Sequence, residues 1–378
     1  MLLFSLLFFS LFAFNIFFKK SKIIYILTII FLWIIMTFTY NNADESVYLS
    51  RYTSPALWKG NTELLFGLLI NICRSFKLSF IQYKGVLSFI ELLLTSLTIW
   101  KLSKTPNIII SLYMFYPFVM HVSQIRNALA VSVFVFGYRY LLNEDKNYFK
   151  NFTLLTINDI KYIICIIIAS LIHSASIFWL ILLLAKKLGI KSSIFFTAIF
   201  SAFIVVFFNP SSVNFLLSLL GASTRMGAYM SVAYQSSDYR HYSSILFIVL
   251  VEIIAFLALF LIRRYINRGT DREKKLYNLV IKINILLLVS IAFVYRFTSE
   301  MYRPVEGAMI LNYIIIFNLI PTKLIMKLRT TLRAFTSQLL IYICPIICYF
   351  MIAANKYNFT SIVEPIYKYN YFFNWLLH

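Results

Sequence analysis

The feature that most restricts the fold of this chain is a series of long apolar segments that recurs from one end to the other. Most of them approach the roughly 20 residues that an α-helix needs to cross the hydrocarbon core of a bilayer. The segments are 2–18, 23–40, 84–100, 107–120, 125–142, 157–172, 174–185, 194–208, 243–262, 278–295, 304–320 and 335–354. No polar block between them is long enough to fold as a soluble domain. The sequence therefore predicts an all-α, polytopic membrane protein with a single membrane domain over residues 1–378.

The composition agrees with this class and excludes a nucleic-acid-binding protein. Hydrophobic residues make up 61% of the chain and charged residues 13%, against roughly half and a quarter in an average soluble domain. The net charge of +21 comes from short basic clusters between the apolar segments, whereas a DNA-binding protein gathers its basic residues on one soluble face. Clusters of this kind orient a membrane protein, with the basic loops on the cytoplasmic side.

Loop charge also decides how the region 161–187 is divided. This region can be one long helix or two short helices that turn at His173 and Ser174. With two helices most of the basic residues fall in loops on one side, whereas one helix would place the basic cluster 263–275 on the opposite side. The positive-inside preference therefore predicts a broken pair around His173 and about 12 transmembrane helices, with both termini outside. A broken helix at membrane depth needs protein or water around it, so we expect a cavity beside His173.

The first polar break in the chain, 41–63, carries carboxylates and phenols together. On a helix, Asp44, Tyr48 and Tyr52 lie on one face. We expect this loop on the outer membrane surface, where it supplies an acid or base for chemistry at a sugar hydroxyl. The following segment, 62–76, is too short to span a membrane comfortably and predicts a short interfacial helix.

The outer loops 41–83 and 209–242 are expected to cover the active site. The second loop contains Arg225 and several tyrosines. Aromatic rings stack well on the apolar faces of sugars, although the tyrosine belt of a bilayer interface explains any single one of them better.

Arginines near the ends of apolar segments are the next candidates. Arg126, flanked by Gln124 and Asn127, lies just inside a segment, where an ionised side chain is a functional hypothesis by default. The alternative is that Arg126 extends to the lipid headgroups. Arg303 follows a short outer turn, where it either forms a salt bridge or, with Arg296, binds pyrophosphate through its planar guanidinium.

No cofactor site is evident in the sequence. There is no D-x-D pair, no H-E-x-x-H, no P-loop and no G-x-G-x-x-G. The four cysteines form neither a metal-ligand pattern nor a disulfide framework. We therefore expect no metal and no nucleotide cofactor. His173 and Ser174 are candidates for a base or a sugar-binding donor, or they form a polar helix end.

In combination these motifs resemble the EpsG family of exopolysaccharide and O-antigen polymerases, which are Wzy-like integral membrane glycosyltransferases. The resemblance covers roughly residues 35–320. It rests on Asn42-x-Asp44-x-x-x-Tyr48-x-x-x-Tyr52 with Glu63 downstream, on Gln124-x-Arg126-Asn127-x-Leu129-Ala130, on Ser170-Leu-Ile-His173-Ser174 and on Tyr302-Arg303.

The resemblance implies a metal-independent enzyme that polymerises oligosaccharide repeat units. A growing glycan on undecaprenyl pyrophosphate would be transferred to a new lipid-linked repeat, with undecaprenyl pyrophosphate as the leaving group. The product would be O-antigen, capsule or exopolysaccharide. It further implies a bacterial cytoplasmic (inner) membrane protein with its active site facing the periplasm or cell exterior. Its partners would be lipid-linked donor and acceptor glycans, membrane lipid and a chain-length regulator protein. The resemblance is also compatible with a GT-C-like glycosyltransferase fold.

With this function in view, each candidate receives a role. The general base is Asp44, with Glu63 or His173 as the alternative. The pyrophosphate ligands are Arg126, Arg303 and Arg225. The sugar-positioning residues are Tyr48, Tyr52, Gln124, Asn127 and His173. Two other functions remain open: a flippase for lipid-linked oligosaccharide, which would use the same basic groups, and a membrane acyltransferase, for which His173 alone gives poor support.

Overall fold

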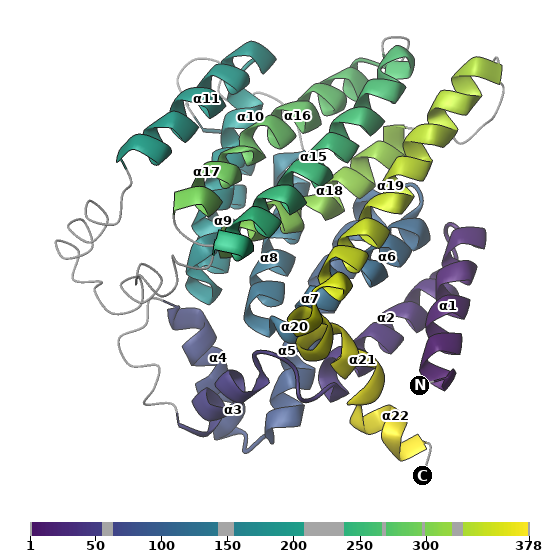
Figure 1. Ribbon diagram of the computed structural model, residues 1–378, viewed down its shortest axis with the longest axis vertical. Helices are drawn as coiled ribbons and strands as arrows, with labels where there is room; N and C mark the ends of the chain where they lie inside the picture. The colour runs from purple at the N-terminus through teal and green to yellow at the C-terminus, as the bar shows by residue number, and fades with distance from the viewer. Residues whose placement is uncertain are drawn as a thin grey trace. The chain divides into compact units, whose positions relative to one another are not determined.

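The computed structural model describes residues 2–54, 63–142, 155–207, 238–266, 270–296, 299–319 and 328–376. Within these ranges the chain is helical apart from short connections and one isolated antiparallel bridge between Thr39 and Asn370 (Figure 1). Of the helices described, five are long and apolar enough to cross a membrane. The structure thus agrees with an all-α membrane protein, while the larger number of spans stays a prediction.

The helices form two compact units. The first contains Met1–Leu180, Tyr313–Asn318 and Tyr342–His378, and the second contains Ile181–Asn312 and Leu319–Ile341. Each unit has its own apolar core.

The first unit begins with nine helices described in sequence and ends with a C-terminal group. Its helices are α1 (Leu2–Phe17), α2 (Lys22–Phe38), α3 (Glu45–Thr53), α4 (Leu64–Ser75), α5 (Phe80–Leu102), α6 (Pro106–Phe115), α7 (Phe118–Ser123), α8 (Ile125–Leu141), α9 (Ile157–Ile172), α20 (Lys356–Asn358), the π-helical turn η4 (Phe359–Val363), α21 (Glu364–Lys368) and α22 (Tyr371–Leu376).

The second unit contains fewer described helices. They are α10 (Leu183–Lys187), α11 (Ile190–Phe207), α15 (Asp238–Ile266), α16 (Asp271–Leu287), α17 (Val289–Arg296) and the 3₁₀ turn η3 (Ser299–Tyr302). Three elements contribute residues to both units: the 3₁₀ helix η2 (Ser174–Leu182), α18 (Arg303–Leu319) and α19 (Leu328–Ala354).

Two predicted segments are interrupted. The chain leaves α9 at His173 and continues as η2, so the break around His173 is present as predicted. The predicted segment 107–120 is also divided, into α6 and α7. Pro117 lies at this second break, where it cannot donate a backbone hydrogen bond to continue the helix, and the Tyr116–Pro117 bond is cis.

Helix α8 lies at the centre of the first unit, packed against α5 and α9. Gly137 lets α8 and α9 approach closely, because a Cβ atom there would lie 3.3 Å from the ring of Tyr162. The Tyr162 hydroxyl donates to the carbonyl of Trp179 at 2.8 Å, and Trp179 stacks on Phe134 with ring centroids 4.0 Å apart. These contacts fasten η2 to the core and so hold the chain on the C-terminal side of His173.

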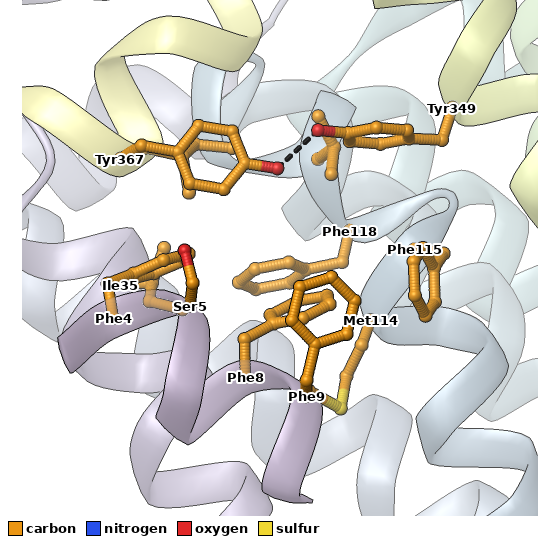
Figure 2. A pocket seen from close by; sticks show the side chains of 12 residues that line it. Phe4, Ser5, Phe8, Phe9, Ile35, Met114, Phe115, Phe118, Tyr349 and Tyr367 are labelled. Carbon is orange, nitrogen blue, oxygen red and sulfur yellow. Dashed lines mark hydrogen bonds between the residues drawn. The ribbon is translucent and has the colours of Figure 1, made fainter. Parts of the chain in front are cut away.

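The C-terminal segment packs against the N-terminal helices. Figure 2 shows an aromatic cavity of about 70 Å³ whose walls come from α1, α2, α6, α7, α19 and α21. The hydroxyls of Tyr349 and Tyr367 hydrogen-bond to each other on the side opposite Phe8 and Phe9. Further along, the Tyr40 amide donates to the carbonyl of Tyr369 at 2.8 Å. The C-terminal segment therefore anchors the chain just before α3.

A candidate active site around Glu63

Glu63 is the residue around which the predicted polar groups gather. It directly precedes α4, and its side chain makes no capping hydrogen bond to that helix. Instead, one carboxylate oxygen, Oε2, accepts from a guanidinium Nη1 of Arg126 at 2.6 Å. The other oxygen, Oε1, lies 3.1 Å from Nδ1 of His173. The carboxylate thus joins two residues that lie far from it in the sequence.

Both partners of Glu63 lie at helix ends. Arg126 is in the first turn of α8, after the N-cap residue Gln124. His173 is the C-cap of α9, with an extended backbone that leads into η2. The backbone N–H of Ser174, the first residue of η2, donates to Glu63 Oε1 at 3.4 Å. Because backbone N–H groups at a helix start are unused within the helix, they are suited to an anionic acceptor.

The cluster is almost entirely removed from water. The side chain of Glu63 is 2% exposed, whereas those of Arg126 and His173 are 14% and 9% exposed. A buried carboxylate is costly unless an opposite charge and hydrogen bonds compensate it, and here both do. What exposure remains in the cluster belongs to the side chains of Arg126 and His173. These two groups, held in place by Glu63, are therefore the ones positioned to meet a ligand.

The contact with Glu63 also determines the tautomer of His173. A carboxylate paired with Arg126 is an acceptor only, so Nδ1 of His173 carries the proton that it donates to Oε1. In the neutral imidazole the lone pair then resides on Nε2, on the opposite side of the ring. This arrangement of carboxylate and imidazole is the one used to orient a general base.

The part of the 41–63 loop that forms α3, Glu45–Thr53, turns two of its predicted residues inward. Asp44 is the N-cap of α3, and Tyr48 and Tyr52 are both buried. The Tyr48 ring lies 6.1 Å from that of Phe66 on α4, and the Tyr52 ring stacks on Tyr83 of α5 at 4.7 Å. The face that Tyr48 and Tyr52 were predicted to share is therefore present, and it fastens α3 to α4 and α5, while the place of the Asp44 carboxylate on that face stays a prediction.

Tyr52 also makes polar contacts through both its side chain and its backbone. Its hydroxyl donates to the carbonyl of Leu78 at 2.6 Å, and its own carbonyl accepts from Arg74 at 2.9 Å. Burial raises the pKa of the Tyr52 hydroxyl above its usual value. The hydroxyl therefore remains a donor at neutral pH, and the roles of Tyr48 and Tyr52 in positioning sugars stay predictions.

Gln124 and Asn127 flank Arg126 and contact each other. The Asn127 amide donates to Oε1 of Gln124 at 3.3 Å, and both side chains are largely buried. They stabilise the start of α8, from which Arg126 extends. Their predicted contact with sugars is not tested by this geometry.

Sequence reasoning gave no role to a second ion pair beside α3. The Lys84 ammonium lies 3.1 Å from Oε1 of Glu45 and also donates to the carbonyl of Thr39, although Lys84 is only 2% exposed. Glu45 in turn accepts from the backbone N–H of Asn41. The pair fixes the start of α3 to α5. A lysine at the start of an apolar segment was the signal that could have revealed it.

A third polar cluster, within α5, α6 and α7, was likewise missed. The Tyr113 hydroxyl donates to Oε1 of Glu91 at 2.6 Å and lies 2.9 Å from Nδ1 of His121. Nδ1 of His121 is 3.2 Å from the same carboxylate oxygen. All three residues are 1% exposed or less. The lone Glu91 in an apolar segment could have indicated it.

Two of the predicted pyrophosphate ligands do not belong to the described part of the first unit. Arg303 begins α18 in the second unit. Arg225 and most of the loop 209–242 lie outside the described residues. Their role in binding pyrophosphate stays a prediction. Among the described residues, no group of three or more His, Cys, Asp and Glu side chains could hold a metal ion.

The fold and the cluster define a class: a helical membrane protein with a buried carboxylate, imidazole and guanidinium gathered at helix ends. The model of the EpsG family matches residues 22–371, and the chain therefore belongs to the EpsG family. Membership indicates a glycosyltransferase-like polysaccharide polymerase in a membrane context. No match was found among curated proteins or among solved structures.

Proposed function

We propose that this protein polymerises undecaprenyl-pyrophosphate-linked oligosaccharide repeat units on the outer face of the bacterial cytoplasmic membrane. The observation that carries the proposal is the contact of one buried carboxylate, Glu63, with both Arg126 and His173. Transfer from a lipid pyrophosphate needs a base for the acceptor hydroxyl and a cation for the leaving group. The cluster supplies both from neighbouring helix ends.

His173 is the proposed general base, and Glu63 the residue that orients it. As the acceptor oxygen bonds to the anomeric carbon of the donor sugar, its proton moves to Nε2 of His173. The bond from that carbon to the pyrophosphate oxygen breaks, and its electron pair leaves with the lipid pyrophosphate. The sequence-level choice of Asp44 as the base remains the alternative, and the geometry around Glu63 supports His173.

Arg126 is the proposed ligand of the pyrophosphate. The charge of the leaving group increases as the glycosidic bond breaks, so a guanidinium beside it stabilises the transition state more than the ground state. Arg303 and Arg225 are proposed to add to this charge. Gln124, Asn127, Tyr48 and Tyr52 are proposed to position the sugars.

The test is the glycan profile of cells that carry His173→Ala, Arg126→Ala or wild-type protein. We expect both variants to insert normally, yet to accumulate lipid-linked glycan of a single repeat on the outer leaflet. Glu364→Gln is the control, because it removes a partly exposed charge whose ion-pair partner in the described part of the chain is Lys368, one helical turn away. Full-length polymer from His173→Ala would remove His173 from the mechanism. Repeat units trapped on the cytoplasmic leaflet would instead indicate a flippase.

A further inference from the structure

An open apolar groove of about 410 Å³ runs between α2 and α5 in the first unit. Its walls include aliphatic side chains that stay exposed among the helices the structure describes. Among these are Ile26, Ile30, Leu93 and Leu97. The groove is separate from the cluster around Glu63 and shares no lining residue with it.

Two hydrogen bonds from aromatic side chains fix the width of the groove. Tyr25 on α2 donates to the carbonyl of Ser96 on α5 at 2.7 Å. Trp33, farther along α2, donates to the carbonyl of Gly85 at 2.9 Å. At the Gly85 end the helices are close, because a Cβ atom on Gly85 would lie 3.2 Å from Thr37. These contacts hold α2 and α5 together along the groove, so its spacing is set by the structure.

The length of the groove matches the depth of one leaflet. The stretch of α5 that lines it, from Phe89 to Trp100, is roughly 16 Å long at a helical rise of about 1.5 Å per residue. The hydrocarbon core of a bilayer is roughly 30 Å thick, so one leaflet contributes about half of that. The groove thus suits a chain that begins at one membrane surface and ends near the midplane.

One end of the groove is cationic. Lys22 lines it there, next to Trp100. Three further lysines are exposed and lie close in sequence to these two residues. They are Lys19 and Lys20, in the turn before α2, and Lys101, which follows Trp100. Of the described residues that line the groove, none is acidic. Lysines at a membrane surface attract anionic lipid headgroups, and tryptophans concentrate at the same depth.

We propose that this groove binds one acyl chain of an anionic phospholipid whose headgroup contacts Lys22. The apolar walls hold the chain, and the Tyr25 and Trp33 contacts fix the distance between the walls. A polyprenyl carrier, whose chain is longer than one leaflet, fits the length of the groove less well. This inference stands independently of the proposed function.

The experiment uses the full-length protein in vesicles of phosphatidylcholine that contain a small fraction of a photoactivatable phospholipid. The diazirine is placed midway along the acyl chain, on either a phosphatidylglycerol or a phosphatidylcholine probe. We expect the phosphatidylglycerol probe to label the peptides of α2 and α5 that line the groove, Lys22–Trp33 and Phe89–Trp100. Lys22→Gln should lower that labelling about fivefold, which is the loss of binding expected when one lysine is removed from near an anionic headgroup. Labelling by the phosphatidylcholine probe should stay unchanged.

Leu93→Trp tests the groove itself, because a larger side chain there fills it. Leu93 is 40% exposed, and Val86, on the same helix but outside the groove, is 38% exposed, so Val86→Trp is the matched control. We expect Leu93→Trp to abolish the labelling and Val86→Trp to retain it. Equal labelling by both probes, insensitive to Leu93→Trp, would overturn the proposal. Displacement of the phosphatidylglycerol probe by an equimolar polyprenyl phosphate would also overturn it and assign the groove to the isoprenoid chain.

Discussion

The first unit contains two buried clusters that each combine a glutamate with a histidine, yet their surroundings differ. Glu63 contacts Arg126 and His173 at the ends of three helices, and the last two side chains keep some exposure. Glu91 instead contacts Tyr113 and His121, and that cluster is closed to water. A glutamate and a histidine together therefore do not define an active site. A cation and the residual exposure of Arg126 and His173 at helix ends are what distinguish the Glu63 cluster.

The largest expected effect of a single substitution is that of His173→Ala on polymerisation. Loss of a general base lowers the rate by roughly 10²- to 10⁴-fold. The measurement is the initial rate of polymer formation from purified lipid-linked repeats in proteoliposomes. His121→Ala is the comparison within the other cluster, and we expect its rate, once corrected for the amount of folded protein, to stay within about threefold of wild type. Equal losses in both variants would erase the distinction between the clusters.

Arg126→Lys is expected to give the next largest effect. Lysine keeps the charge but loses the planar fork of donors that matches both carboxylate and pyrophosphate. Loss of one hydrogen bond to a charged group costs about 1.5–3 kcal/mol, so the rate should fall at least tenfold. The same assay measures it, and a wild-type rate would show that the guanidinium geometry is not used.

Tyr113→Phe should affect stability without affecting activity. It removes the donor to Glu91 and leaves a buried carboxyl oxygen less well satisfied. The expected destabilisation is about 1–3 kcal/mol, seen as a lower thermal midpoint in detergent. A polymerisation rate reduced tenfold or more in correctly folded protein would instead give the Glu91 cluster a part in the reaction.

The smallest expected effect is that of Tyr52→Phe. The ring keeps its stacking on Tyr83, and only the hydrogen bond to Leu78 is lost. We expect about 1 kcal/mol of destabilisation and an unchanged KM for the acceptor. A raised KM would show that the hydroxyl itself contacts sugar.

Local patterns in the sequence predicted much of the helical structure. Hydropathy located the long helices, and the polar pair at His173 and Ser174 indicated the break that the structure contains. The break at Pro117 was missed because the apolar character of 107–120 continues across it. The face shared by Tyr48 and Tyr52 followed from helical spacing, which is a local property.

For the candidate site, the sequence predicted which residues take part but not which of them contact one another. Glu63 and His173 are 110 residues apart, and Glu63 and Arg126 are 63 apart. Which charged residues pair depends on the packing of α4 against α9, and no local pattern encodes it. For the same reason the partners of Lys84 and Glu91 could not be assigned from sequence, although each is a charged residue in an apolar segment.

The central claim is that Glu63 and His173 act as one catalytic unit. A double-mutant cycle of Glu63→Gln, His173→Ala and the combined variant, assayed for initial polymerisation rate in proteoliposomes, tests it most directly. The account predicts that the double variant is slower than His173→Ala alone but loses much less than the product of the two single losses, because Glu63 acts through the imidazole and otherwise only by holding Arg126. Rate losses that multiply in the double variant, or wild-type polymerisation by either single variant, would contradict it.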